Sequence, residues 1–384
     1  MTTTKALQRF WRSCCRALGL TLALGGLLRA QAPAAITLSA GTTGPAFSKV
    51  AAVRELEDGR TLVIDSKERI VAVVDWSSPE ARTIGRAGDG PGEYRYPGDL
   101  VPLAGDSTLL TDRQTGRWFM LHRDRITSTL TADRPLVRFV GGSPAGADTM
   151  GRVLVHHGSH FSAQAPPQEG PGSTEVADSI AVILVTRKNG DADTIARIRG
   201  PFRGQNRVRQ RVEEMNITYF LVNPLQAGDQ ALLFPDGWIG MAFVAPYRVE
   251  WRTPSGSIVR GGPLPYSAQP VDERVKRQAI EDQWPISPQA PKFASTDFVG
   301  WPDVVPPFLG KALSALPDGK IAIKRTSLGA DRTVQYDIVD RRGVLAGVLR
   351  LAPNERIAGF GKRTVYVVAT DADDLEVLRR HPWP

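Results

Sequence analysis

The sequence predicts an all-β protein, a six-bladed β-propeller with a short helical and proline-rich insertion. Two stretches of the chain, 56–74 and 103–121, align with each other. Each contains a strand, a Gly/Asp turn, a second strand that ends in Asp, another turn and a third strand. Such a unit cannot bury both of its faces alone, so copies must pack against one another. A repeat of this length with several short strands predicts propeller blades.

Four weaker copies follow the two that align well. The six units begin near residues 50, 98, 146, 228, 309 and 354. In the third unit, Asn189-Gly190 between two apolar runs predicts a hairpin. A strand near 46–50 is expected to complete the last blade and to close the ring. We therefore expect residues 33–384 to form one propeller domain.

Residues 1–32 have the pattern of a secretory signal peptide. A basic leader is followed by the apolar run 17–28 and by the small-x-small site Ala30-Gln31-Ala32. The apolar run is shorter than the roughly 20 residues that a bilayer span needs. We therefore expect cleavage, a mature chain without a transmembrane segment, and a location outside the cytoplasm, either in the periplasm or beyond the cell.

Loss of this leader changes what the composition implies. Cys14 and Cys15 are the two cysteines and would both leave with it, so the mature fold depends on its apolar core without disulfides. Five of the 48 basic residues and none of the 40 acidic residues lie in the leader, which lowers the formal net charge from +8 to +3. This balance demands no anionic partner, and we expect a monomer.

Residues 265–308 depart from the β pattern. Val271, Val275 and Ala279 are four residues apart, which predicts a helix over 270–284. Prolines then recur as far as residue 307, which indicates a long ordered loop. Loops on a rigid scaffold often carry specificity, so this insertion is a candidate ligand surface.

Two tryptophans, Trp284 and Trp301, belong to the insertion. They are candidate ligand contacts at the mouth of the ring. The favoured alternative is that they pack the insertion onto the blades.

Three motifs stand out along the chain. They are the L-x-D-G strand pairs at Leu56 and Leu316, the run Gly85–Tyr94, and Leu-Ala-Gly-Asp-Ser at 103–107. These motifs resemble those of the six-bladed, NHL-like (TolB-like) β-propellers of secreted bacterial proteins. The resemblance implies a six-bladed ring. It is clearest in the first two blades, whereas 140–310 match in outline. The Trp-Asp dipeptides typical of WD40 blades are missing.

The run from Gly85 to Tyr94 is expected to connect two blades. Its glycines at 85, 88, 90 and 92 permit the positive φ angles that such a crossing needs. Glu93 is expected to cap exposed backbone donors or to face the channel mouth, and Glu93 and Arg95 are candidate ligand contacts. A phosphate-binding loop is disfavoured because no helix start follows.

His156, His157 and His160 form a histidine cluster. Neighbouring residues of a strand point to opposite faces, and no acidic residue of this segment completes a zinc site. We therefore favour an exposed loop and predict no metal there.

The resemblance also implies a comparison with propeller lactonases and gluconolactonases, which hold calcium in the central channel. Calcium generally takes 6–8 oxygen ligands. Asp65 and Asp112 occupy equivalent blade positions, but an Asp in such a turn usually bonds backbone groups, and we favour that role. Residues 371–374 are interpreted as a hairpin turn. No Gly-x-Ser-x-Gly motif occurs, so we predict no catalytic residue and no cofactor, with calcium as the alternative.

An arginine-rich stretch, 197–211, contains Arg197, Arg199, Arg203, Arg207, Arg209 and Arg211 with no acidic residue among them. A solvated linker between blades is the favoured interpretation. The alternative is a docking edge for an anionic polymer, because guanidinium groups suit sulfate, phosphate and carboxylate. Arg203, Arg207 and Arg209 are then the candidate ligand-binding residues.

Together these patterns predict an exported, non-catalytic binding or scaffolding protein, with its ligand surface at the channel mouth and on the insertion. They leave the ligand undefined. The alternatives are a calcium-dependent propeller hydrolase or lactonase, and a protein that binds an anionic polymer through 197–211.

Overall fold

The computed structural model describes residues 33–78, 80–130, 143–157, 179–201, 205–212, 215–284, 291–328 and 332–384. The predicted signal peptide, 1–32, lies outside the described residues. The compact unit to which the following description applies is Ala34–Pro384.

Six antiparallel sheets of the described residues form the blades. Blade 1 consists of β3 (Val50–Glu55), β4 (Thr61–Asp65), β5 (Ile70–Val74) and β6 (Ala81–Ile84). Blade 2 consists of β9 (Pro97–Pro102), β10 (Ser107–Asp112), β11 (Trp118–His122) and β12 (Arg125–Leu130). Blade 3 consists of β13 (Ser143–Ala147), β14 (Arg152–His157), β15 (Ser179–Thr186) and β16 (Ala192–Arg199).

The second half of the ring repeats this arrangement. Blade 4 consists of β19 (Gln230–Leu233), β20 (Ile239–Phe243), β21 (Arg248–Arg252) and β22 (Ile258–Arg260). Blade 5 consists of β23 (Leu313–Ala315), β24 (Ile321–Lys324), β25 (Val334–Val339) and β26 (Leu345–Leu351). Blade 6 consists of β27 (Glu355–Phe360), β28 (Thr364–Thr370), β29 (Glu376–Pro382) and β2 (Thr42–Phe47). The structure confirms the predicted fold class, and each blade begins within a few residues of its predicted start.

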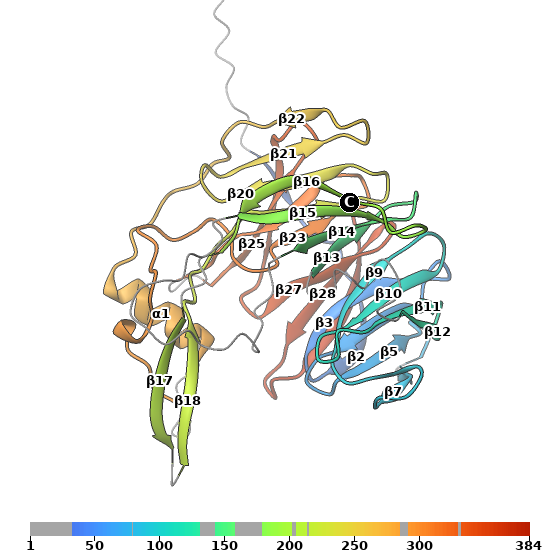
Figure 1. Cartoon of the computed structure of the whole chain (residues 1–384), viewed down its shortest axis with the longest axis horizontal. Helices are drawn as coiled ribbons and strands as arrows, with labels where there is room; N and C mark the ends of the chain where they lie inside the picture. The colour runs from blue at the N-terminus through green and yellow to red at the C-terminus, as the bar shows by residue number, and fades with distance from the viewer. Residues whose placement is uncertain are drawn as a thin grey trace, which may run out of the picture. The chain divides into compact units, whose positions relative to one another are not determined.

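The first strands of the blades surround the channel. Neighbours in the order β3, β9, β13, β19, β23 and β27 contact one another, and β27 contacts β3 again. In Figure 1 the red blade 6 lies beside the blue blade 1, where the ring closes. Closure depends on β2, which pairs with β29 as the outermost strand of blade 6, with Ala46 opposite Val377. This confirms the predicted closing strand, which begins a few residues earlier than expected.

An additional strand was not expected from the sequence. β1 (Ala34–Ile36) runs parallel to β26 and widens blade 5 to five strands.

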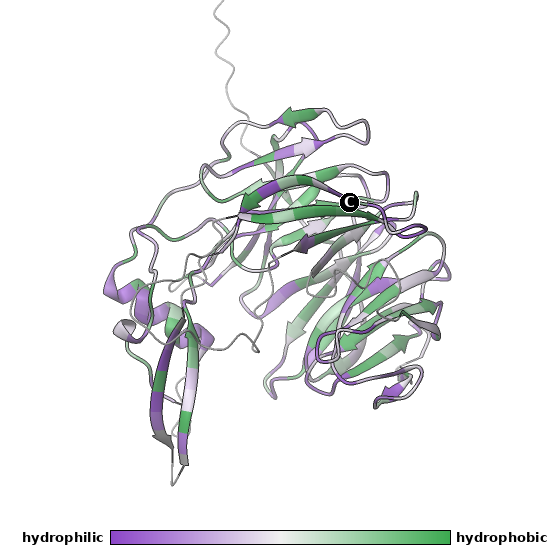
Figure 2. Ribbon diagram, viewed as in Figure 1, coloured by the Kyte–Doolittle hydropathy of each residue, from purple (hydrophilic) through white to green (hydrophobic). Residues whose placement is uncertain are grey.

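The blades hold together by sharing cores. Successive residues of a strand point to opposite faces of its sheet. In β4, Leu62 and Ile64 pack against blade 2, whereas Val63 packs against blade 6. All five residues of β4 are buried because both faces of the blade are covered. Figure 2 shows apolar residues along the blade strands, whereas much of α1 (Glu273–Gln283) is hydrophilic.

The two ends of the channel differ in their connections. Because the strands of each blade alternate in direction, links between blades lie at the end where the first strands begin. We call this end the connection face, and it carries the long segments 85–96, 200–229 and 261–312. The opposite end, the turn face, carries short turns such as 56–60 and 316–320.

A hairpin and the insertion form a lobe at the connection face. β17 (Gln205–Val212) and β18 (Met215–Val222) pair with each other and extend away from the blades (Figure 1). Leu221 of the hairpin packs against Ile280 of α1 and against Phe298. The stretch 197–211, expected as a linker between blades, lies between blades 3 and 4, and it contains the end of β16 and most of β17.

The predicted helix is confirmed as α1, which begins after Asp272. The Asp272 side chain accepts a hydrogen bond from the Val275 backbone N–H, as a helix N-cap does. The apolar spacing is explained because Val275, Ala279 and Ile280 are buried. A short 3-10 helix, η2 (Ser295–Asp297), follows. None of the described helices has the length and hydrophobicity of a membrane-spanning helix.

The glycine-rich connection folds over a buried tyrosine. Tyr94 donates a hydrogen bond to the Ile84 carbonyl oxygen and accepts one from the Val71 N–H. β7 (Arg86–Ala87) and β8 (Glu93–Tyr94) form a small parallel pair beside it. The expectation of positive φ is confirmed at positions 85, 88 and 92 but was wrong for Gly90. The backbone N–H of Gly90 instead donates to the Glu93 carboxylate.

Two buried aspartates each accept hydrogen bonds from two separate segments of the connection face. Asp112 accepts hydrogen bonds from the backbone N–H groups of Arg95 and Tyr96, which enter blade 2, and of Gln114 and Thr115, which form the next turn. Burial favours a higher pKa for Asp112, but these hydrogen bonds outweigh it and the pKa is lowered. The predicted turn role is thus confirmed.

Asp65 repeats the arrangement in blade 1. It accepts hydrogen bonds from Ser48, Lys49, Lys67 and Glu68. Each aspartate therefore joins the segment that enters its blade to a turn within that blade.

We predict that Asp112→Asn lowers the free energy of unfolding by about 2–4 kcal/mol, because the amide leaves buried N–H donors without an acceptor. Since the folded pKa is lowered, the stability from Asp112 is present above the unfolded value of about 3.9. It is lost as the pH falls through the folded value. Urea denaturation at pH 7 and pH 3 measures both effects.

The matched control is Asp318→Asn, in an exposed turn, for which the free energy of unfolding should change by less than about 1 kcal/mol. Equal urea midpoints for Asp112→Asn and the unmodified protein at pH 7 would contradict the assignment.

Candidate functional site

A cavity of about 420 Å³ lies on the connection face between the insertion and blade 5. The insertion contributes Tyr266, Ser267, Gln269 and Val305, and blade 5 contributes the segment 325–328 together with Thr333 and Gln335. The cavity exists because the chain leaves blade 4 at 261, crosses over the start of blade 5 and returns to it only at 313.

Arg325 forms the charged wall of this cavity. Its Nη1 lies 2.7 Å from Oδ2 of the buried Asp337, which also accepts a hydrogen bond of 2.8 Å from the Tyr247 hydroxyl. The guanidinium also donates to the carbonyl oxygens of Pro307 and Pro265. Only 14% of the side chain is exposed. The charge of Arg325 is therefore neutralised inside the protein.

Two tyrosine rings enclose the same guanidinium. The Cζ atom of Arg325 lies 4.9 Å from the ring centre of Tyr247 and 4.7 Å from that of Tyr266. Burial raises the pKa of both phenols, and the charge of Asp337 raises that of Tyr247 further. Both hydroxyls remain protonated at neutral pH, and the Tyr266 hydroxyl donates a hydrogen bond to the Val305 carbonyl oxygen.

The rest of the cavity offers neutral hydrogen-bonding groups. Gln335 donates through its amide to Asp337 over 2.8 Å, which leaves the amide oxygen available. The Ser327 hydroxyl donates to the Thr333 carbonyl oxygen. Among the described lining residues there is no histidine, aspartate or glutamate that could act as a general base. The arrangement therefore suits binding and orientation of a ligand.

An ion pair crosses the channel at the connection face. Lys311, just before β23 of blade 5, pairs with Asp99 of β9 in blade 2. These blades are opposite each other in a ring of six. His156 of β14 accepts a hydrogen bond at Nε2 from the Ala231 N–H. Burial, with a smaller contribution from Lys311, lowers the pKa of His156 to about 4, so its imidazole is neutral at pH 7.

The exposed loop expected for the histidine cluster was wrong for His156, which lies on β14. The His157 side chain and His160 lie outside the described residues.

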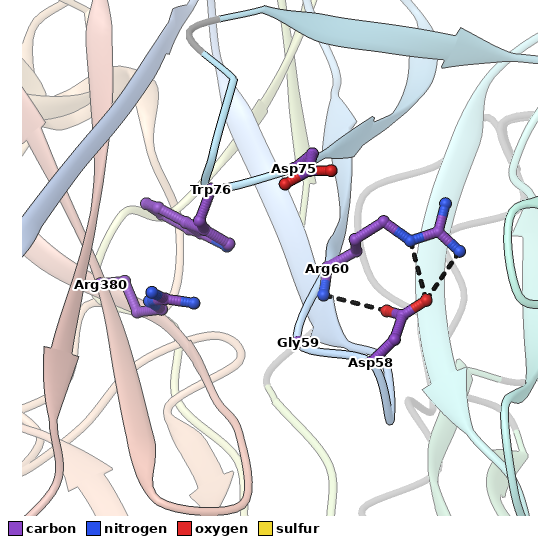
Figure 3. A pocket seen from close by; sticks show the side chains of 6 residues that line it. All are labelled: Asp58, Gly59, Arg60, Asp75, Trp76 and Arg380. Atoms are coloured by element: carbon purple, nitrogen blue, oxygen red, sulfur yellow. Dashed lines mark hydrogen bonds and ion pairs between the residues drawn. The ribbon is translucent and has the colours of Figure 1, made fainter.

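A second cavity, of about 350 Å³, opens on the turn face between blades 6 and 1 (Figure 3). Figure 3 shows Arg60 bonded to Asp58, with Nε 2.9 Å from Oδ2. The Cζ atom of Arg380 lies 4.8 Å from the ring centre of Trp76, whose Nε1 donates to the Thr61 hydroxyl. Because Arg380 belongs to blade 6 and Trp76 to blade 1, we assign these contacts to closure of the ring.

Two predicted ligand contacts, Glu93 and Arg95, bond within their own connection. Glu93 accepts a hydrogen bond of 2.8 Å from the Gly90 N–H and pairs with Arg86. These contacts lower the pKa of Glu93. Arg95 pairs with Asp89, with Nε 2.7 Å from Oδ1. Both residues stabilise the crossing between blades 1 and 2, and their contact with a ligand stays a prediction.

The other predicted contacts lie in the lobe. Arg207 and Arg209 are exposed on β17, whereas Arg203 lies outside the described residues. Trp284 and Trp301 are half-buried, with ring centres 5.4 and 5.8 Å from that of Phe298. Neither tryptophan is among the residues that line the cavity of 420 Å³. A ligand-binding role for these four residues stays a prediction.

The described residues contain no group of three or more histidine, cysteine, aspartate or glutamate side chains that could hold a metal. The carboxylate oxygens of Asp65 and Asp112 already accept hydrogen bonds from backbone N–H groups. An N–H group cannot itself coordinate a cation. At the connection face, the carboxylates of Asp99 and Glu376 are paired with Lys311 and Arg356.

Sequence reasoning missed the residues that line the cavity. Tyr266 and Gln269 lie inside the insertion that was expected to carry specificity, so their region was predicted but their roles were not. Arg325 and Gln335 belong to an ordinary strand and turn of blade 5. No spacing in the sequence distinguishes them from surface residues.

Comparison with known proteins gives structural similarity without similarity in sequence. No protein-family model matches the chain, and no curated protein matches it in sequence. The chain, by contrast, is similar in structure to many solved protein chains. One is a protein from Bacteroides fragilis whose name gives export only as an expectation. It is 9% identical to this chain, the match covers 88% of this chain and 91% of that chain, and the TM-score is 0.45.

Two further solved structures have similar values. Regucalcin from Agrobacterium tumefaciens, a calcium-binding protein, is 10% identical over 92% of this chain and 98% of its own, with a TM-score of 0.41. A gluconolactonase from Xanthomonas campestris is 10% identical over 91% and 99%, with a TM-score of 0.43. The chain has the six-bladed architecture of the NHL-like propellers that its blade motifs resemble.

We predict that neither EDTA nor added Ca²⁺ changes the Tm by more than about 1 °C. A specific site at one hundred times its Kd would contribute about 2.7 kcal/mol to stability. Differential scanning calorimetry at constant ionic strength measures the effect. A fall of several degrees in EDTA, restored by Ca²⁺, would contradict this expectation and favour a calcium-dependent enzyme.

Proposed function

We propose that this protein is an exported, non-catalytic binding protein that holds a small, uncharged polar ligand of the sugar or polyol class. The observation that carries the proposal is the cavity of about 420 Å³ between the insertion and blade 5. Its volume is in the range of small-molecule sites.

The chemistry of the cavity supports an uncharged ligand. Asp337 neutralises Arg325 inside the wall, so no net charge is left for an ionic partner. Amide and hydroxyl groups from Gln269, Gln335 and Ser267 suit the hydroxyl groups of a sugar, because each can donate or accept. Tyr266 adds an aromatic surface.

The location and the lack of catalysis are part of the same proposal. The leader of residues 1–32 supports export. The cavity is formed by one chain and needs no second subunit, so the protein acts as a monomer. The alternative of a calcium-dependent hydrolase is less favoured, since the part of the chain that the structure describes has no group of three or more acidic or other metal-binding side chains.

The test uses a panel of neutral monosaccharides, disaccharides and polyols, added to the full-length protein in thermal shift and calorimetric titrations. We predict that at least one raises the Tm, and that Gln269→Ala weakens its binding about tenfold, the loss of one or two hydrogen bonds.

The matched control is Gln114→Ala, an exposed glutamine on the connection face of blade 2, which should bind as the unmodified protein does. If no neutral compound binds, or if Gln269→Ala binds equally well, the proposed site is wrong.

A second candidate function is favoured by the hairpin of the lobe. Arg207 and Arg209 lie on its exposed face, and Arg207 is opposite Phe220, which is 54% exposed. The Cζ atom of Arg207 lies 5.9 Å from the Phe220 ring centre. Val208 and Tyr219 point to the other face, which packs on the insertion. A cationic ribbon with its opposite face covered suits an anionic polymer, and we propose acidic polysaccharide.

We predict that the full-length protein is retained on heparin at low salt and released as salt rises, because polymer contacts release counterions. The combined change of Arg203, Arg207 and Arg209 to Ala should shift elution to clearly lower salt. The control removes the same charge from the turn face. It changes three exposed arginines there to Ala: Arg82, Arg123 and Arg342. Equal elution of the two triple variants would remove this function.

A further inference from the structure

At the connection face, the buried carboxylate of Glu376 forms ion pairs with two cationic side chains. Glu376 begins β29 and accepts a hydrogen bond of 2.7 Å from the Val50 N–H. Its Oε1 lies 2.6 Å from Nζ of Lys49, and its Oε2 lies 2.6 Å from Nη2 of Arg356. The Lys49 side chain is 58% exposed. Glu376 therefore holds both Lys49 and Arg356 in place, and the Lys49 side chain remains accessible to solvent.

Lys324 brings a third cation from blade 5. It ends β24 and lies opposite Tyr336 in register, so the two side chains share one face of the sheet. The Tyr336 hydroxyl accepts a hydrogen bond of 2.9 Å from the N–H of Ile357, the neighbour of Arg356. Within the described part of the chain, the Lys324 ammonium group has neither an ion pair nor a hydrogen bond.

The charges of this group do not balance. Desolvation lowers the pKa of Lys324, and the positive charges of Arg356 and Lys49 lower it further. Lys49 and Arg356 share the carboxylate of Glu376, and Lys324 adds a third positive charge near them. On the other side of the channel, Lys311 and Arg113 share the single carboxylate of Asp99, which adds to the positive excess. Like charges at close range disfavour one another, and a bound anion would relieve the repulsion.

We propose that Lys49, Lys324 and Arg356, the cationic cluster, bind an oxyanion of the phosphate or carboxylate class. A guanidinium has five N–H donors and an ammonium has three, so Arg356 and Lys49 keep donors free after pairing with Glu376. Arg356 also donates one to the Val50 carbonyl oxygen. An oxyanion offers several acceptors and forms strong charge-assisted hydrogen bonds with such groups.

This site is separate from the cavity for an uncharged ligand. Lys324 and Arg325 are consecutive, so they project to opposite faces of the strand end. Lys324 faces blade 6, whereas Arg325 packs against Tyr247 of blade 4. The two sites can therefore be tested independently.

The test compares inorganic phosphate, succinate and chloride at equal ionic strength, using the Tm of the full-length protein and calorimetric titration. We expect phosphate or succinate to raise the Tm by roughly 2 °C relative to chloride, and the stronger of the two identifies the anionic group. In Lys324→Met this rise should disappear and the Kd should increase at least about tenfold.

Without an added anion, Lys324→Met should raise the Tm in low salt, because it removes a desolvated charge from beside two others. A merely structural lysine would lower the Tm when removed. Lys362→Met, an exposed lysine in a turn of blade 6 on the turn face, is the control and should respond to phosphate as the unmodified protein does.

Two outcomes would overturn the proposal. One is a Tm that responds to phosphate and succinate no more than to chloride. The other is an equal phosphate response in Lys324→Met and Lys362→Met. If Lys324→Met does not fold, Lys324→Gln gives the same test, since the amide removes the charge and keeps a polar side chain of similar length.

Discussion

Packing between adjacent blades is the interaction on which the structure depends. Each blade is buried on both faces, so the apolar residues of β4 contribute to two different cores. No blade has a core of its own, and every core needs two neighbours. The ring is therefore stable only as a closed set, which is why the pairing of β2 with β29 matters more than its single row of hydrogen bonds indicates.

The rigid ring leaves one end free to vary. Turn-face connections are short and fixed by the strands they join, whereas the connection face carries long segments outside the shared cores. Both proposed ligand sites and the arginine face of the hairpin arise there. Strand alternation also separates two chemistries at the end of β24: Lys324 joins an excess of positive charge, and Arg325 is neutralised by Asp337.

Much of the ring could be predicted from the sequence, because blade strands, tight turns and the α1 stripe have local periodicities. The aspartates were interpretable for the same reason, since Asp65 and Asp112 repeat at one position. The hairpin was missed because the polar residues of β17 outnumber its apolar ones, and its apolar side is covered only by a segment far along the chain. The cationic cluster was invisible because Lys49, Lys324 and Arg356 are distant in sequence and meet only through the ring.

The closing sheet has a consequence for how the chain is made. Val50 and its acceptor Glu376 are 326 residues apart, so the strand beside Val50 leaves the ribosome long before its partner exists. At about 5–20 residues per second, β2 waits roughly 15–65 s with its edge unpaired. During that interval five blades can accumulate as an open arc whose two ends expose apolar faces. Chaperone protection, or export before folding, is needed for as long as this arc is incomplete.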